Sequence, residues 1–308
     1  MFKKKSSLMA LVLLLSLWIT GCAGANVGGD EAQSASPPTT ASGASPSLTV
    51  KVLDVGQGDA ILIQTATQTA LIDTSDVDER DKLRRELDKA KVKVIDKVIL
   101  THPHADHIGG MEVLLKDYTV KEVYDNGMPS TSPIYRSYMK LLKKQGIARQ
   151  ELTAGDSLDL GDGVAFEIYY PTKELVAQGQ QKGYKHDPNN ESVAGKLIYK
   201  DFSMLFTGDG EKSEEQQLLQ SKGGELKSRV LKAPHHGSKT SSGNRFMQAV
   251  RPEAVIISSG VGNDYGHPHD VTLNTYAKHN CQVYRTDLNG TVTITTDGHK
   301  YEVQGEKT

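Results

Sequence analysis

Cysteine and long apolar runs are scarce in this sequence of 308 residues. Cysteine occurs only at Cys22 and Cys281, so a framework of several disulfides is excluded as the source of stability. Beyond residue 21, no apolar run approaches the ~20 residues that a membrane-spanning helix needs. The chain must therefore bury an ordinary hydrophobic core, and its length suffices for one large domain or two small ones.

A surplus of positive charge is also lacking, with 36 basic against 38 acidic residues. Three of the lysines, Lys3, Lys4 and Lys5, stand within the first 21 residues, so the remainder carries 33 basic and 38 acidic residues and a net charge of −5. This balance argues against tight non-specific binding of nucleic acid by the whole surface, although it leaves room for a local basic groove. No stretch interleaves aromatic residues with Lys or Arg in the manner of a single-strand channel.

The N-terminus has the pattern of an export signal. Lys3–Lys5 precede an apolar stretch from Leu8 to Ile19, which ends in Ile19-Thr20-Gly21-Cys22. This ending resembles the bacterial lipobox, in which cleavage precedes a cysteine that then carries lipid; the alternative is an ordinary signal peptide with an incidental cysteine. We expect residues 1–21 to be a lipoprotein signal peptide and Cys22 to be the lipidation site. The protein would then be anchored in the membrane, at the extracellular face of the bacterial cell.

Residues 23–47 are rich in Ala, Gly, Ser, Thr and Pro and have almost no large apolar side chain. Such a composition cannot bury a core, so we expect the lipidated cysteine and a flexible linker over 22–47, followed by a folded domain over 48–308. If Cys22 carries lipid, Cys281 has no partner, and we expect it to be a small buried apolar residue.

Short apolar segments then alternate with amphipathic ones. The patterns predict strands at Leu48–Val55, Ala60–Thr65, Ala70–Asp73, Lys97–Thr101, Lys121–Tyr124, Val164–Tyr170, Val193–Tyr199, Ser203–Thr207, Val230–Ala233, Ala254–Ser258, Gln282–Arg285 and Thr291–Thr295. They predict helices at Arg80–Ala90, Gly109–Leu115, Ile134–Lys144, Lys212–Gln220, Gly243–Val250 and Val271–His279. Many strands with interspersed helices favour an α/β domain in which two packed sheets carry helices outside.

The strongest chemical signal follows the apolar strand predicted to end at Thr101. His102, His104, Asp106 and His107 place four potential metal ligands within six residues. Imidazole and carboxylate are good ligands for zinc and similar ions, and a rigid strand end positions them. A loop of this kind can direct His102 and His104 at one ion while Asp106 and His107 reach a second.

This segment resembles the His-x-His-x-Asp-His motif of the metallo-β-lactamase superfamily. Further motifs follow in order: Leu53-Asp54-Val55-Gly56-Gln57-Gly58-Asp59-Ala60, Leu71-Ile72-Asp73-Thr74, Phe206-Thr207-Gly208-Asp209 and Lys232-Ala233-Pro234-His235-His236-Gly237-Ser238. Together they resemble the extracellular hydrolase domain of ComEC-type DNA-uptake proteins and its free-standing relatives. The resemblance runs from Leu48 to the C-terminus and implies the αββα sandwich of the metallo-β-lactamase fold, without the membrane channel of the ComEC proteins.

The resemblance also implies roles for individual residues. Metal ligands would be His102, His104, Asp106, His107, Asp209 and His236. Asp209 would bridge two ions, because a carboxylate has two oxygens. Either His235 or His236 would be the ligand of the second ion, and we favour His236. The other histidine and His267 at the pocket rim would contact substrate or assist the leaving group. Asp106 would be a catalytic residue as well as a ligand, so the catalytic set is Asp106, His235 and His267.

Further residues would support the ligands or the substrate. Asp73 would hydrogen-bond the metal-binding loop. The same supporting group contains Asp54, Gln57, Asp59, Asn190 and Ser238. Many superfamily enzymes have a third histidine for the first metal in the region of Asn189-Asn190-Glu191-Ser192, but this sequence has none there. His186 lies near and could substitute, although an exposed loop histidine is the favoured interpretation. The first metal would otherwise be weakly held or completed by water.

The implied cofactors are two divalent ions, zinc first and manganese as the alternative. Two ions with a bridging Asp209 suit a phosphodiesterase, and a nuclease acting on DNA is the first candidate. Phosphodiesters of the cell envelope come second, as in phosphorylcholine esterases that act on teichoic acid. A hydrolase of lactones, thioesters or β-lactams and a non-catalytic metal-binding module are the remaining hypotheses.

Overall fold

The computed structural model describes residues 48–307. The predicted signal peptide, the lipidation site Cys22 and the linker of 22–47 lie outside the described residues, so those predictions stay predictions. None of the helices in the described range is long and apolar enough to cross a bilayer.

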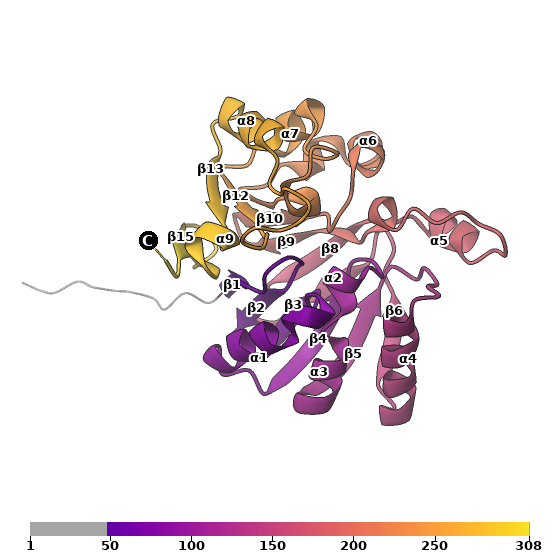
Figure 1. The fold of residues 1–308 in the computed structure, drawn as a ribbon. Helices are drawn as coiled ribbons and strands as arrows, with labels where there is room; N and C mark the ends of the chain where they lie inside the picture. Colours follow the sequence, from indigo (N-terminus) through magenta and orange to yellow (C-terminus); the bar gives the residue numbers. More distant parts are fainter. Residues whose placement is uncertain (1–47, 308) are drawn as a thin grey trace, which may run out of the picture. The chain divides into compact units, whose positions relative to one another are not determined.

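The strands between residues 48 and 307 form two sheets (Figure 1). The first contains β1 (Leu48–Val52), β2 (Ile61–Thr65), β3 (Thr69–Ile72), β4 (Val94–Leu100), β5 (Thr119–Asp125), β6 (Ala148–Glu151), β14 (Val292–Thr296) and β15 (Tyr301–Gly305). The second contains β7 (Ser157–Asp159), β8 (Ala165–Tyr170), β9 (Ala194–Tyr199), β10 (Phe202–Phe206), β11 (Val230–Lys232), β12 (Ala254–Ile257) and β13 (Gln282–Arg285). Their orders are β15-β14-β1-β2-β3-β4-β5-β6 and β13-β12-β11-β10-β9-β8-β7.

Helices cover the two outer faces of this pair of sheets (Figure 1). The first sheet carries α1 (Arg80–Lys89), α3 (Met111–Asp117) and α4 (Pro133–Gln145), and the second carries α6 (Lys212–Ser221), α7 (Asn244–Val250) and α8 (Asp270–Lys278). Short helices are α2 (Ala105–Ile108), α5 (Lys173–Gly179) and α9 (Thr286–Asn289), and 3-10 turns occupy Val77–Glu79, Asn189–Glu191, Gly223–Leu226 and Pro234–Gly237.

Three apolar layers hold these elements together. The central layer lies between the sheets and combines inward-facing residues such as Val50 and Ile63 with Phe166 and Phe206. One outer layer packs the first sheet against α1, α3 and α4, and the other packs the second sheet against α6, α7 and α8. Each fully buried aliphatic or aromatic side chain stabilises the fold by about 1.5–3 kcal/mol relative to exposure. The predicted αββα sandwich is confirmed.

Local signals explain why the best-predicted elements form where they do. The α4 helix begins at Ser132, whose hydroxyl accepts the Tyr135 N–H, followed by Pro133 in the first helical position. It ends at Gly146, which has a left-handed φ of 67°. The alternating pattern of β1, with Leu48, Val50 and Val52 buried, matches the period of a strand that has one face in the core.

Several elements went unpredicted because their sequences carry no periodic apolar signal. The edge strand β6 reads Ala-Arg-Gln-Glu, β7 has three residues, and β15 alternates between half-buried and exposed positions. The expectation for Cys281 was partly wrong. Its thiol is only half-buried, at the rim of the layer beneath α7 and α8.

Candidate metal centre

The carboxyl ends of the parallel strands position the candidate site. β3 and β4 run parallel in the first sheet, and β10, β11 and β12 run parallel in the second. Asp73 follows β3, His102 follows β4, Asp209 follows β10 and His236 follows β11. Ligand sites of α/β sheets favour such strand ends, because the loops there are free to carry functional side chains.

Four of the predicted ligands meet in one cluster. Asp106, His107, Asp209 and His236 offer ligand atoms that all lie within 4.8 Å of one another. The Nε2 atoms of His107 and His236 lie 3.3 and 3.4 Å from Asp209 Oδ1. Asp106 Oδ2 lies 3.4 Å from His236 Nε2. We name these four residues the ligand tetrad.

The tetrad has the chemistry of a metal site. His107 Nε2, His236 Nε2 and Asp209 Oδ1 are buried, and none of them has a hydrogen-bond partner among the described residues. A buried polar atom without a partner is costly, and a divalent cation bound between these atoms removes that cost. The residues therefore fit the metal ion that the sequence pattern implies.

Partners behind the two tetrad histidines direct them at the cluster. His107 Nδ1 lies 2.8 Å from Asp73 Oδ2, and His236 Nδ1 lies 3.1 Å from the carbonyl oxygen of Ser258. Each acceptor takes the Nδ1 proton, which leaves the Nε2 lone pair free to bind metal. Asp73 also accepts hydrogen bonds from the N–H and the hydroxyl of Thr101, so it connects the end of β3 to the metal-binding loop as predicted.

The electrostatics of the tetrad favour a cation. Burial lowers the pKa of His236, but the carboxylates of Asp209 and Asp59 outweigh it and raise this pKa to about 10. The pKa of His107 is likewise raised well above its ordinary value, despite burial, by Asp209, Asp73 and Asp106. Carboxylates this close to one another favour positive charge between them. Protons on the two imidazoles supply that charge in the metal-free protein, and a metal ion would supply it in their place.

The second predicted ligand pair is less complete. His102 Nε2 lies 3.0 Å from His104 Nδ1, so both imidazoles can address one ion. Burial and the neighbouring imidazole of His107 lower the pKa of His102 well below its ordinary value, which keeps it neutral. Ser192 fills the adjacent space, with its hydroxyl 3.3 Å from His102 Nδ1. His186 is exposed and pairs with Glu191 at 3.0 Å, as favoured from the sequence, and does not join the pair.

The neighbouring histidines His235 and His236 both have left-handed backbones, with φ of 47° and 52°, and their rings lie 6.2 Å apart at an angle of 68°. His236 enters the tetrad, whereas His235 is half-buried at its rim. Its Nδ1 lies 3.1 Å from Glu211 Oε1, and its Nε2 lies 3.7 Å from Asp209 Oδ2. Glu211 was missed from the sequence, since nothing local marks it as a partner of a histidine 24 positions later.

Three supporting residues brace the loops around the site. Asp59 forms a buried ion pair of 2.8 Å with Lys232, which links the β1–β2 loop to β11. Gly58, with φ of 120°, permits this loop to approach the metal-binding loop, because a Cβ there would meet the Asp106 carbonyl oxygen at 2.5 Å. Gln57 Oε1 accepts the Gly260 N–H at 3.2 Å.

The remaining supporting residues lie further from the tetrad or act on the backbone. Asn190 Oδ1 accepts the N–H groups of Glu211 and Glu214, and so caps the start of α6. The Ser238 hydroxyl lies 2.9 Å from that of Thr240. Asp54 is not brought to the tetrad, because its carboxylate pairs with Lys307 at 3.2 Å on the C-terminal segment.

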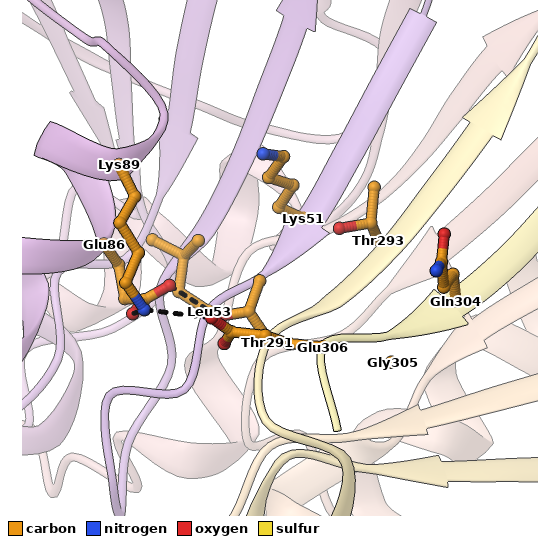
Figure 2. A pocket seen from close by; sticks show the side chains of 9 residues that line it. All are labelled: Lys51, Leu53, Glu86, Lys89, Thr291, Thr293, Gln304, Gly305 and Glu306. Atoms are coloured by element: carbon orange, nitrogen blue, oxygen red, sulfur yellow. Dashed lines mark hydrogen bonds and ion pairs between the residues drawn. The ribbon is translucent and has the colours of Figure 1, made fainter. Parts of the chain in front are cut away.

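A separate pocket near that segment lies on the outer side of β1, β14 and β15 (Figure 2). In this pocket Lys89 pairs with Glu86 at 2.6 Å and with Glu306 at 3.1 Å. The Thr291 hydroxyl donates to Glu86 at 2.7 Å (Figure 2). No histidine lines this pocket, so the strand-end tetrad remains the candidate site.

Comparisons with known proteins agree with this geometry. The family model "Metallo-beta-lactamase superfamily" matches residues 53–261. The chain is 34% identical over 262 residues to ComE operon protein 3 of Bacillus subtilis, which covers 79% of the chain and 32% of the relative. It is 32% identical over 242 residues to Competence protein ComA of Neisseria gonorrhoeae, which covers 78% of the chain and 31% of that relative. The chain thus spans about a third of these relatives' length.

Solved structures share the fold at low sequence identity. The metallo-beta-lactamase fold protein YhfI of Bacillus subtilis aligns with a TM-score of 0.51 at 13% identity, covering 77% of this chain and 96% of that one. CmlA of Streptomyces venezuelae, a diiron beta-hydroxylase, aligns with a TM-score of 0.52 at 13% identity, covering 82% and 54%. With its sandwich fold, its buried His/Asp cluster and these matches, the chain belongs to the metallo-beta-lactamase superfamily.

Proposed function

We propose that this chain is an exported, metal-dependent phosphodiesterase that cleaves DNA and is held at the extracellular face of the cell membrane by lipid on Cys22. The observation that carries the catalytic part is the position of the Asp209 carboxylate. Its Oδ1 lies 3.3 and 3.4 Å from the Nε2 atoms of His107 and His236, and its Oδ2 lies 3.7 Å from His235 Nε2. A buried carboxylate in the middle of several imidazoles has two oxygens with which it can serve two cations.

The tetrad would hold one ion, and His102 with His104 and Asp209 would hold the second. Two divalent cations at such a site neutralise charge on a phosphodiester and lower the pKa of water, which is chemistry suited to in-line displacement at phosphorus. Asp106 and Asp209 would bind these cations as ionised carboxylates. Although burial raises the pKa of Asp209, His236 and His107 outweigh it and hold that pKa well below its ordinary value.

His235 and His267 would contact the substrate. His267 was expected at the pocket rim but is buried, with 8% of its surface exposed. Burial and the neighbouring His236, His235 and His269 lower the pKa of His267 to about 4. At neutral pH, His267 is therefore a neutral imidazole, which can donate an N–H hydrogen bond to a phosphate oxygen. The better candidate for assisting the leaving group is His235, whose Nδ1 lies 3.2 Å from the Thr240 hydroxyl and 3.1 Å from Glu211 Oε1, so that its Nε2 is left to face the site.

Similarity to competence proteins favours DNA over other phosphodiesters. Lys232 stands close to the site in the sequence, but it is buried against Asp59 and is not available to the substrate. The substrate phosphates would therefore contact the metal ions, His235 and His267. This arrangement is consistent with a chain whose overall charge is slightly negative.

The test uses the full-length protein purified without chelator. Metal content is measured first, and then cleavage of bis(p-nitrophenyl) phosphate and of single-stranded DNA, with Asp209→Asn beside Asp201→Asn as a surface control. Metal-dependent cleavage of both substrates that disappears only in Asp209→Asn is the expected result. Cleavage of the small diester alone would redirect the assignment to an envelope phosphodiester. Bound metal without either activity would refute it in favour of another ester class or a binding module.

A further inference from the structure

The loop between β12 and α8 reaches from the tetrad to solvent and is held rigidly. The Asn263 amide donates to the carbonyl oxygens of Gly260 and His267, and its Oδ1 accepts the His267 N–H. Gln57 holds the Gly260 N–H from the β1–β2 loop. Residues 260–267 therefore form a braced turn, whose backbone is held at Gly260 and at His267.

A series of rings runs outward along this loop. His267 lies over His236, with ring centroids 6.2 Å apart and planes 25° apart. Tyr265 stacks on His267 in turn, at 5.6 Å and 20°. The rings thus continue from a tetrad ligand to the surface in nearly parallel planes.

The outer end of this series is exposed. Tyr265 is 64% exposed and Val261 is 82% exposed. These are two of only five large apolar side chains that are exposed between residues 48 and 307. Scattered exposed apolar residues need no explanation, but two on one braced loop beside a metal centre point to a binding surface.

We infer that Tyr265 is a stacking platform for an unpaired nucleobase next to the scissile phosphodiester, with Val261 as a second exposed apolar side chain on the same loop. This inference rests on the proposed phosphodiesterase function and adds a substrate preference. An aromatic ring with an open face stacks on any base, so it confers little sequence selectivity. A base inside a duplex has both faces covered by its neighbours. The platform therefore favours single-stranded over double-stranded DNA.

The experiment measures KM and kcat of the full-length, metal-loaded protein on three substrates: oligothymidylate, the same sugar-phosphate strand without bases, and bis(p-nitrophenyl) phosphate. The variants are Tyr265→Leu, which removes the ring, and Tyr265→Phe, which keeps it. Val94→Ser is the control for an exposed apolar side chain, because Val94 begins β4 whereas the site follows the end of that strand.

We expect Tyr265→Leu to raise KM on oligothymidylate by roughly 5- to 100-fold, as the loss of one base–aromatic stack implies. Its KM on the abasic strand should not change. Tyr265→Phe and Val94→Ser should match the wild type on every substrate. Wild-type protein should itself bind the abasic strand less well than oligothymidylate.

Two results would overturn the platform while leaving the phosphodiesterase intact. One is an unchanged KM of Tyr265→Leu on oligothymidylate, and the other is an equal rise on the strand without bases. If wild-type protein cleaves bis(p-nitrophenyl) phosphate but neither strand, DNA as the substrate fails and the platform fails with it. If it cleaves none of the three, the phosphodiesterase assignment itself is wrong.

Discussion

Replacing Asp73 by asparagine should weaken metal binding without contact between residue 73 and the metal. Asp73 is fully buried and has a φ of 58°, which asparagine also tolerates. In the native protein its carboxylate accepts the N–H and hydroxyl of Thr101, each at 2.7 Å, and the Nδ1–H of His107 at 2.8 Å.

An asparagine can satisfy only part of this set. Its carbonyl oxygen must stay opposite the Thr101 N–H, which places the amide NH₂ opposite His107 Nδ1. Two donors cannot face each other, so His107 has to move its proton to Nε2, the atom that would bind the metal. Loss of such a supporting partner typically reduces metal affinity by about 10- to 100-fold, which corresponds to about 1.4–2.7 kcal/mol.

The assay is competition between metal-free protein and a chromophoric chelator for Zn²⁺, with circular dichroism to verify the fold. The matched control is Asp201→Asn, because Asp201 also pairs with a histidine Nδ1, that of His299 at 2.6 Å, but both side chains are exposed. The control should bind Zn²⁺ as the wild type does. The reasoning is refuted if folded Asp73→Asn keeps wild-type affinity, or if the control loses as much.

Three further predictions follow from the same structure and sequence. His107 and His236 have raised pKa values in the metal-free protein, so Zn²⁺ must displace their protons when it binds. The affinity for Zn²⁺ should therefore rise more than tenfold per pH unit between pH 6 and 8. Calorimetry in buffers of different ionisation enthalpy measures the released protons, and finding no release would contradict this prediction. Burial and the nearby Glu215 carboxylate raise the pKa of Glu214 well above its ordinary 4.5. The folded state therefore binds this proton more tightly than the unfolded state, and the protein loses stability as the pH rises above 4.5. Glu214→Gln should flatten the pH dependence of the urea midpoint between pH 5 and 8, and parallel curves for the variant and the wild type would contradict this. Cys22→Ser should move the protein from the membrane fraction to the soluble fraction, and continued anchoring would exclude the lipobox.

Much of the fold was predictable because its signals are local. The apolar run of β4 and the cap residues of α4 act within a few positions, and both elements were predicted to within three residues at each end. The ligands His102, His104, Asp106 and His107 also belong to one short segment, so the sequence alone brings them near one another. The edge strands β6 and β15 were not predicted, because half-exposed polar residues occur in strands as well as in loops.

Contacts between distant segments were decided by tertiary structure. The choice between His235 and His236 depends on which imidazole finds the Ser258 carbonyl, 22 positions further along the chain. Lys232 could be a substrate cation by its sequence position, yet it is buried against Asp59, 173 positions earlier. In both cases, a partner that is distant in the sequence fixes where the side chain lies.

The sequence by itself determined the type of chemistry, because a dense His/Asp motif after an apolar strand has few purposes other than metal binding. Only the tertiary structure decided how the ligands are shared. It closed a tetrad around Asp209, left His102 and His104 beside a serine, and turned Asp54 away toward Lys307. The physical reason is that metal ligation depends on distances of a few ångströms between strand ends, and those distances arise only when the two sheets pack together.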